Sequence, residues 1–175
     1  DSIIDSLNYA KYIQRSLLPD VKKMENYFGE NLIYSMPKDI VGGDFYWFKT
    51  FGEKAILIAA DCTGHGVPGG FITMLGSLLI ETSTGDTLKS PEIILSDLNR
   101  GLVTLLKQDE EDSIQDGMDL AICQIDREQR TIKFSGSRNG IYIIHDDGDI
   151  SNFSGDSVPV GGVYSKSCLL YTSPS

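Results

Sequence analysis

Two short segments, each with an aspartate beside glycine, constrain this chain more than any other part of its sequence. They are VGGDFYW at residues 41–47 and AADCTGHG at residues 59–66. The glycine pair before Asp44 permits a tight turn or a close backbone approach, and the aromatic residues after it favour a strand over Asp44–Thr50. We therefore expect one carboxylate at the start of a strand.

The second segment follows the apolar run Ala55–Ala60, which has the length of a buried strand and ends at Asp61. Carboxylates at strand edges suit hard divalent cations, and magnesium or manganese sites use few carboxylates together with water. An aspartate at such a place is also commonly a turn former or a helix cap. Taken singly, Asp44 and Asp61 leave both interpretations open.

The composition is that of a globular domain with an acidic surface. The chain has 175 residues and a formal net charge of −10, which argues against nucleic acid or an anionic membrane as partner. Cys62, Cys123 and Cys168 are widely spaced and predict no disulfide framework. No apolar run reaches the roughly 20 residues of a membrane span. We expect a cytoplasmic domain, which could still belong to a membrane-anchored parent.

Helical periodicity marks three segments. The first runs to Pro19 and fits either a helix packed on its own domain or a short dimerising seam, through Ile3, Leu7, Ala10, Ile13 and Leu17. The second follows the GHG turn, with an expected core-facing stripe of Phe71, Met74, Leu75, Leu78 and Leu79. The third begins at Ser90-Pro91, and its expected buried residues are Ile94, Leu95, Leu98, Leu102, Leu105 and Leu106.

The remaining pattern predicts strands joined by turns. Residues 20–30 are polar and are expected to form a loop, and Asn31 to Met36 is expected to form a strand closed by Pro37. Three later strands are predicted at Leu120–Ile125, Thr131–Ser135 and Ile141–His145. Strands at both ends with helices between them indicate an α+β fold.

Read together, GGDFYW and ADCTGHGVPGGF resemble the PPM family of metal-dependent protein serine/threonine phosphatases, in the branch of the bacterial sporulation stage II phosphatase. The phrases at residues 5–14 and 116–121 are also similar to that branch. The resemblance covers the chain from near residue 1 to about residue 162. It implies two mainly antiparallel sheets packed as a sandwich with flanking helices, and a site at one edge of the sandwich.

The resemblance also implies the site residues. Asp44 and Asp61 would hold two divalent metal ions, manganese or magnesium, with Asp61 bridging them, and the carbonyl of Cys62 would be a further ligand. Asp119 could serve as an outer or third-metal ligand. His65 is a candidate general acid, although it could equally pin the glycine turn.

The C-terminus departs from the family pattern. A Thr-Asp-Gly phrase is expected after an apolar strand, yet Ser173-Pro174 stands there. We therefore expect residues 1–19 to be a linker or switch helix, 20–167 an incomplete phosphatase domain, and 168–175 a non-matching tail.

The resemblance implies a phosphoserine/phosphothreonine phosphatase, the output domain of a bacterial signalling protein. Its substrate would be a phosphorylated regulatory protein of the anti-anti-sigma type or similar, and a homodimer could form through the N-terminal helix. Two alternatives stay open: a non-catalytic pseudophosphatase or fragment that binds a protein partner, and a hydrolase of small phosphate esters.

Overall fold

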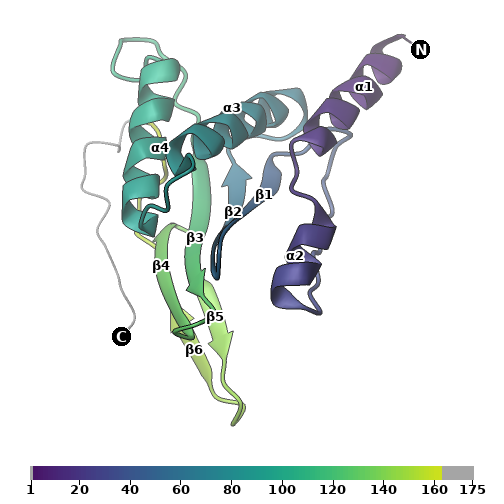
Figure 1. Cartoon of the computed structure of the whole chain (residues 1–175). Coiled ribbons are helices and arrows are strands. Elements are labelled where there is room, and N and C mark those ends of the chain that lie inside the picture. Colours follow the sequence, from purple (N-terminus) through teal and green to yellow (C-terminus); the bar gives the residue numbers. More distant parts are fainter. Residues whose placement is uncertain (1, 163–175) are drawn as a thin grey trace.

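A four-stranded antiparallel sheet is the centre of the computed structural model, which describes residues 2–162 (Figure 1). Its strands lie in the order β1-β2-β3-β4, and β5 and β6 form a separate two-stranded ribbon. The strands are β1 (Asp44–Phe51), β2 (Lys54–Cys62), β3 (Met118–Asp126), β4 (Thr131–Ser137), β5 (Ile141–Ile144) and β6 (Ile150–Phe153). The helices are α1 (Ser2–Ser16), α2 (Val21–Phe28), α3 (Gly66–Thr84) and α4 (Pro91–Leu105).

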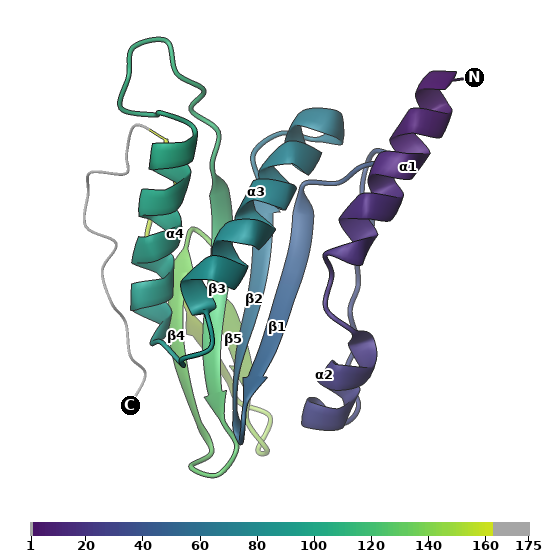
Figure 2. The same ribbon diagram turned by 45° about the horizontal axis from the view of Figure 1, so that its top comes forward.

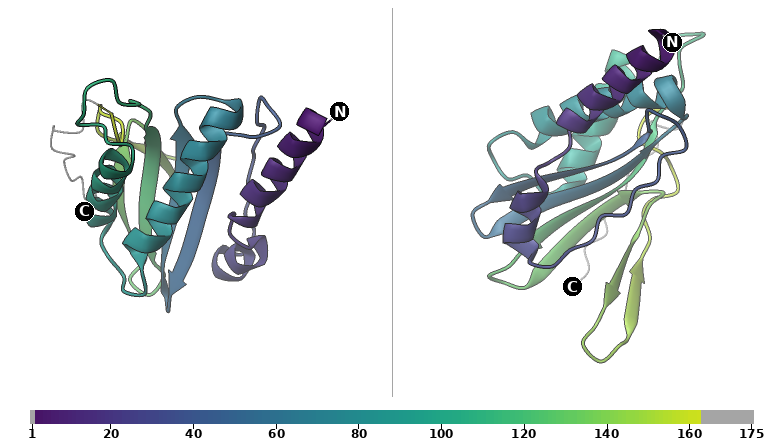
Figure 3. Two further views of the ribbon diagram at one scale, coloured as in Figure 1. Left: turned by 90° about the horizontal axis from the view of Figure 1, so that it is seen from above. Right: turned by 90° about the vertical axis from the view of Figure 1, so that its right-hand side faces the viewer.

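The two faces of the large sheet bury different side chains. Because successive residues of a strand point to opposite faces, Phe45 and Trp47 join the core under α3 and α4, whereas Phe48 packs with α2. Figures 2 and 3 show α3 and α4 side by side over one face, with α1 beside α3. On the other face, Tyr27 of α2 makes an edge contact with the Phe48 ring at 5.6 Å between centroids.

Most predicted elements are confirmed. The antiparallel strands and helices of an α+β fold are present, and the first helix spans Ser2–Ser16 as its periodicity indicated. Face-to-face packing of two sheets as a sandwich stays a prediction. Ser173-Pro174 and the proposed tail from residue 168 lie outside the described residues.

Two predictions near the N-terminus were wrong. Residues 20–30 contain the helix α2 instead of a loop; the Asp20 carboxylate caps it by accepting a hydrogen bond from the Lys22 backbone N–H at 2.9 Å. Met24 and Tyr27, three residues apart, supply its buried face. Residues 31–36 belong to no helix and no strand of the described part of the chain, and Leu32, Tyr34 and Met36 are exposed.

The predicted core-facing stripe of α3 was wrong for most of its residues, although Leu79 is partly buried against the core. Phe71 and Leu78 are 63% and 61% exposed, whereas the buried face consists of Ile72, Ile80 and small residues between them. A Cβ atom at Gly76 would lie only 2.8 Å from Met118 Cε, so small residues let this face approach the sheet. Both faces of α3 show helical periodicity, and the face with the smaller side chains is the one that packs against the sheet. On α4, Leu105 is likewise exposed instead of buried.

The strand β6 was not expected, since Ile150–Phe153 is short and carries two polar residues between its ends.

Within residues 2–162, no helix has the length and apolar character that crossing a membrane requires.

The assignment of faces on α3 predicts unequal effects for two similar truncations. Ile80→Ala should lower the free energy of unfolding by about 2–5 kcal/mol, because Ile80 is fully buried and the substitution leaves a cavity. The matched control Leu78→Ala, at an exposed position on the same helix, should cost less than about 1 kcal/mol. Urea unfolding of both variants checks this, and equal losses would contradict the assignment.

Candidate active site

Three aspartates lie on one rung of the large sheet. The pairing of β1 with β2 sets Asp44 opposite Asp61, and the pairing of β2 with β3 sets Asp61 opposite Asp119. Directly paired residues on antiparallel strands are about 4.5–5.5 Å apart at Cα and share a face of the sheet. The strand register therefore gathers three carboxylates from distant parts of the sequence.

Asp44 opens β1 and Asp61 lies at the end of β2, one residue before its last residue, Cys62, as expected of carboxylates at strand edges. Thr63 then ties this end of β2 to the start of β3. Its backbone N–H donates to the Gly117 carbonyl at 2.9 Å, and its hydroxyl accepts from the Gly117 N–H at 2.8 Å. These bonds hold the register two residues before Asp119.

The carboxylates disturb one another electrostatically. Partial desolvation raises the pKa of Asp44, and a hydrogen bond and charge repulsion from Asp61 raise it further. Burial is also the main cause of the raised pKa of Asp119, where the charge of Asp61 acts in the same direction and Arg138 opposes it. The cluster thus carries more negative charge than its surroundings offset.

The cluster fits a divalent cation by its chemistry. Asp119 Oδ1 is buried and accepts no hydrogen bond, and its ion pair with an Arg138 terminal nitrogen is long, at 3.8 Å. A cation would give this orphaned oxygen a partner and relieve the repulsion between the carboxylates. Within residues 2–162, no three His, Cys, Asp or Glu side chains already converge on one point as a preformed metal site.

The loop before Asp44 is held from two helices. The Gln14 side chain of α1 donates to the Gly42 carbonyl at 2.6 Å and accepts from the Gly42 N–H at 3.1 Å. From α3, the Thr73 hydroxyl donates to the Gly43 carbonyl at 2.9 Å. A Cβ atom at Gly43 would lie 2.9 Å from the Gly64 carbonyl oxygen, so only glycine fits between the two motif loops.

The two other predicted site residues differ in their surroundings. His65 Nδ1 lies 2.7 Å from Asp39 Oδ2, and the ring is 69% exposed. It lines a small hollow together with Asp61 and Asp119. The Cys62 thiol lies on the opposite, helix-covered face, where burial raises its pKa to about 12. A thiol there is structural, which leaves the backbone carbonyl as the atom of Cys62 that could act at the site.

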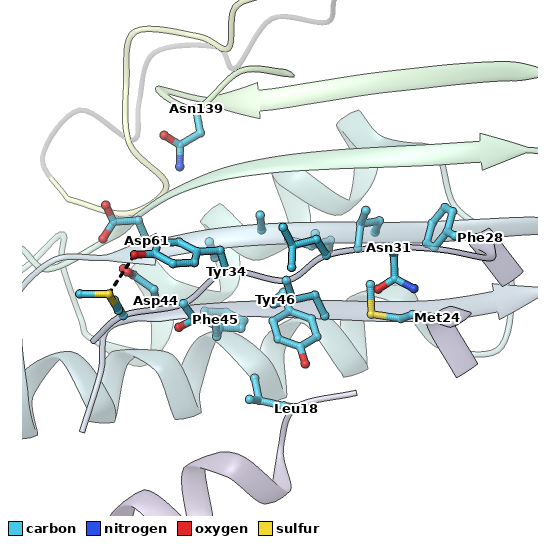
Figure 4. Close-up of a pocket in the computed structure, with 18 of the residues that line it drawn as sticks. Leu18, Met24, Phe28, Asn31, Tyr34, Asp44, Phe45, Tyr46, Asp61 and Asn139 are labelled. Carbon is cyan, nitrogen blue, oxygen red and sulfur yellow. Dashed lines mark hydrogen bonds between the residues drawn. The ribbon is translucent and has the colours of Figure 1, made fainter. Parts of the chain in front are cut away.

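A groove of about 910 Å³ runs from the carboxylates along the sheet face. Figure 4 shows Asp44 and Asp61 at one end of it, with Tyr34 beside them and Asn139 above. Its far end is lined by apolar side chains that include Met24 and Phe28. The groove thus joins a charged end to an apolar one.

The comparisons with known proteins agree with this geometry. The family model of Stage II sporulation protein E (SpoIIE) matches residues 52–166. The chain belongs to the SpoIIE family of PP2C-type phosphatase domains. The comparison with curated proteins gave no match.

Solved structures of this family share the fold. The SiaA-PP2C domain of Pseudomonas aeruginosa is 31% identical over 91% of this chain and 63% of its own, with a TM-score of 0.81. SpoIIE from Bacillus subtilis, a structure that contains its PP2C domain, is 21% identical over 77% and 37%, with a TM-score of 0.59. RsbX, solved in complex with magnesium, is 20% identical over 70% and 55%, with a TM-score of 0.50.

This chain therefore spans less than two thirds of each of these three relatives. PP2C domains use divalent metals, and the magnesium complex of RsbX is an instance within the family. A structure described under the bacterial stressosome and one of the RsbU and RsbW domains of Rv1364c from Mycobacterium tuberculosis share the fold, at 21% and 13% identity with TM-scores of 0.56 and 0.58.

The contact between Gln14 and Gly42 predicts that α1 supports the loop before Asp44, where the expected metal ligands begin. Gln14→Ala should weaken manganese affinity about 10-fold, since the loop before Asp44 loses two hydrogen bonds. Calorimetric manganese titration checks this, with Asn8→Ala, an exposed position on the same helix, as control. Equal affinities in both variants and the unmodified chain would contradict the supporting role.

The raised pKa values predict a pH effect on the metal-free protein. A carboxyl group whose pKa is raised by folding stabilises the fold below its unfolded pKa, and that stability is lost as pH rises through the folded pKa. Removing the central charge should therefore help at neutral pH. In chelator, Asp61→Asn should add roughly 0.5–1 kcal/mol, about 1–4 °C in Tm, at pH 7 and little at pH 3. A loss of stability at pH 7 would contradict repulsion within the cluster.

Proposed function

We propose that this chain is a metal-dependent protein serine/threonine phosphatase domain that removes phosphate from a regulatory protein in bacterial signalling. The observation that carries the proposal is the alignment of Asp44, Asp61 and Asp119 on one rung of the sheet. Three carboxylates beside one another suit a site for two divalent cations, manganese or magnesium, with Asp61 between them.

The chemistry requires charge stabilisation and a strong nucleophile, because phosphate monoesters hydrolyse extremely slowly in water. When bound, paired divalent cations acidify water and stabilise the phosphoryl oxygens in an in-line displacement. The chain's part is to hold them: Asp44 and Asp61 by their carboxylates, Cys62 by its carbonyl and Asp119 as an outer ligand. No covalent enzyme intermediate is needed.

His65 is proposed as the proton donor to the leaving serine or threonine oxygen. The Asp39 carboxylate contacts Nδ1 at 2.7 Å and orients the ring, so Nε2 is the nitrogen that would deliver the proton. The exposed ring suits a large protein substrate, which would approach from solvent. A substrate of the anti-anti-sigma type, or a similar small phosphoprotein, fits the regulatory systems in which relatives occur.

We further propose a cytoplasmic output domain that includes residues 20–167, with the N-terminal helix acting as linker and dimer contact. In support of that contact, α1 has no buried residue, and Ile3 and Tyr12 are 76% and 72% exposed. The sandwich packing implied by the resemblance belongs to the same proposal.

The second candidate function is that of a pseudophosphatase or fragment which binds a protein partner through the same fold. One observation favours it. Among the described residues, the carboxylates are neighbours, but no three His, Cys, Asp or Glu side chains converge to form a metal site. A pseudophosphatase would bind manganese without hydrolysing either phosphorylated substrate.

The experiment is hydrolysis of p-nitrophenyl phosphate and of a phosphoserine peptide with manganese, compared between the unmodified chain and Asp61→Asn. We expect a loss of at least about 100-fold in kcat/KM, because the central carboxylate is removed. Asp86→Asn, which changes an exposed carboxylate between α3 and α4, is the matched control and should keep full activity.

The substrates separate the candidates. Activity on the peptide but not on the small ester supports a protein phosphatase. No manganese-dependent activity on either substrate, with the chain folded, would refute the enzyme and leave the binding module.

A further inference from the structure

The turn that follows β4 reaches the carboxylate cluster. Arg138 is bridged to Leu120, the residue after Asp119, and its side chain faces the Asp119 carboxylate. Asn139 lines the groove together with Asp44 and Asp61, and Figure 4 shows its amide directed toward Asp61. Two polar residues from one turn thus lie over the acidic rung.

This turn is held in a conformation that its sequence does not favour. Arg138 has a φ of 58°, in the left-handed region that non-glycine residues rarely adopt. The Asn139 carbonyl packs so closely on Gly136 and Gly155 that a Cβ atom at either glycine would collide with it. The Arg138 N–H also donates to the Asp156 carbonyl at 2.6 Å. These contacts fix the backbone of Arg138 beside the carboxylate cluster.

Only part of the Arg138 guanidinium group is engaged in contacts with other residues of the chain. Its Nε donates to the Ser157 carbonyl at 3.2 Å, which orients the group. One terminal nitrogen lies 3.8 Å from Asp119 Oδ1, too far for a hydrogen bond, and the side chain remains 45% exposed. Donors of the planar fork are therefore available to an anion that approaches the carboxylate cluster from solvent.

The anion that fits is a phosphate. The fork of an arginine matches two phosphoryl oxygens, and its charge persists at any physiological pH. A phosphate dianion that enters a site built from carboxylates needs positive charge from the protein as well as from cations. A role confined to neutralising Asp119 would be better served by a close, bidentate pair than by a contact of 3.8 Å.

We propose that Arg138 binds the phosphoryl oxygens of the substrate beside the carboxylate cluster, a role that rests on the proposed phosphatase function. Arg138 then acts on the substrate, and Asp119 stays available as a ligand. The turn built on Gly136 and Gly155 fixes where the phosphoryl group sits relative to Asp44 and Asp61.

The test separates phosphate binding from metal binding. Manganese alone is titrated by calorimetry into the unmodified chain, Arg138→Gln and Arg138→Lys, and inorganic phosphate is then titrated into each manganese-loaded protein. Arg130→Gln is the matched control, because Arg130 also has a left-handed backbone, with φ of 53°, but lies in the exposed turn between β3 and β4. Thermal unfolding of each variant verifies the fold.

We expect Arg138→Gln to weaken phosphate binding about 10- to 100-fold while manganese affinity stays within about 3-fold. Arg138→Lys should lie between, since the charge remains but the fork is lost, and Arg130→Gln should match the unmodified chain. With the phosphoserine peptide as substrate, KM should rise more than kcat falls.

Unchanged phosphate affinity in Arg138→Gln, with manganese still bound, would overturn the role of Arg138 and leave the phosphatase proposal standing. A loss of manganese affinity alone would show that Arg138 serves only to organise Asp119, which also overturns it. If the unmodified chain takes up no manganese, the proposed function fails, and the role of Arg138 fails with it.

Discussion

The antiparallel register of β1, β2 and β3 is the constraint on which the site depends. Strand pairing is a backbone interaction, yet it decides that residues 44, 61 and 119 occupy one rung and one face. A slip of one residue would turn a carboxylate toward the core under α3 and α4, where an unpaired charge is costly. The apolar side chains on that face therefore enforce the register, and the register in turn keeps the carboxylates together.

The site is supported by parts of the molecule that serve the core as well. Small residues on α3 allow the helix to approach the sheet closely, and one of them, Thr73, also holds the Gly43 carbonyl. Gln14 reaches the same loop from α1, a helix that buries no residue of its own. A helix without buried residues that hydrogen-bonds to the loop before Asp44 gives the N-terminal segment a direct contact with that loop.

Sequence reasoning reached β1 to β5, the helices α1, α3 and α4 of the described residues, and the motif aspartates, because each has a local signal; it missed β6 and placed a strand at residues 31–36 where there is none. Apolar runs and glycine turns mark β1 and β2, and periodicity marks α1, α3 and α4. It missed α2, an eight-residue helix in a polar stretch, and chose the wrong face of α3, where two stripes compete. The local sequence does not mark the roles of Gln14, Thr73 and Arg138. Each of these side chains contacts a residue more than 18 positions away in the sequence. The left-handed backbone of Arg138 could not be predicted from an arginine.

The most direct measurement of the central claim is the anomalous scattering of manganese in crystals of this chain. We predict peaks bounded by the carboxylates of Asp44, Asp61 and Asp119, with Asp61 in contact with each ion. Manganese bound elsewhere, or carboxylates that stay apart while the metal is saturating, would contradict a centre built on this rung.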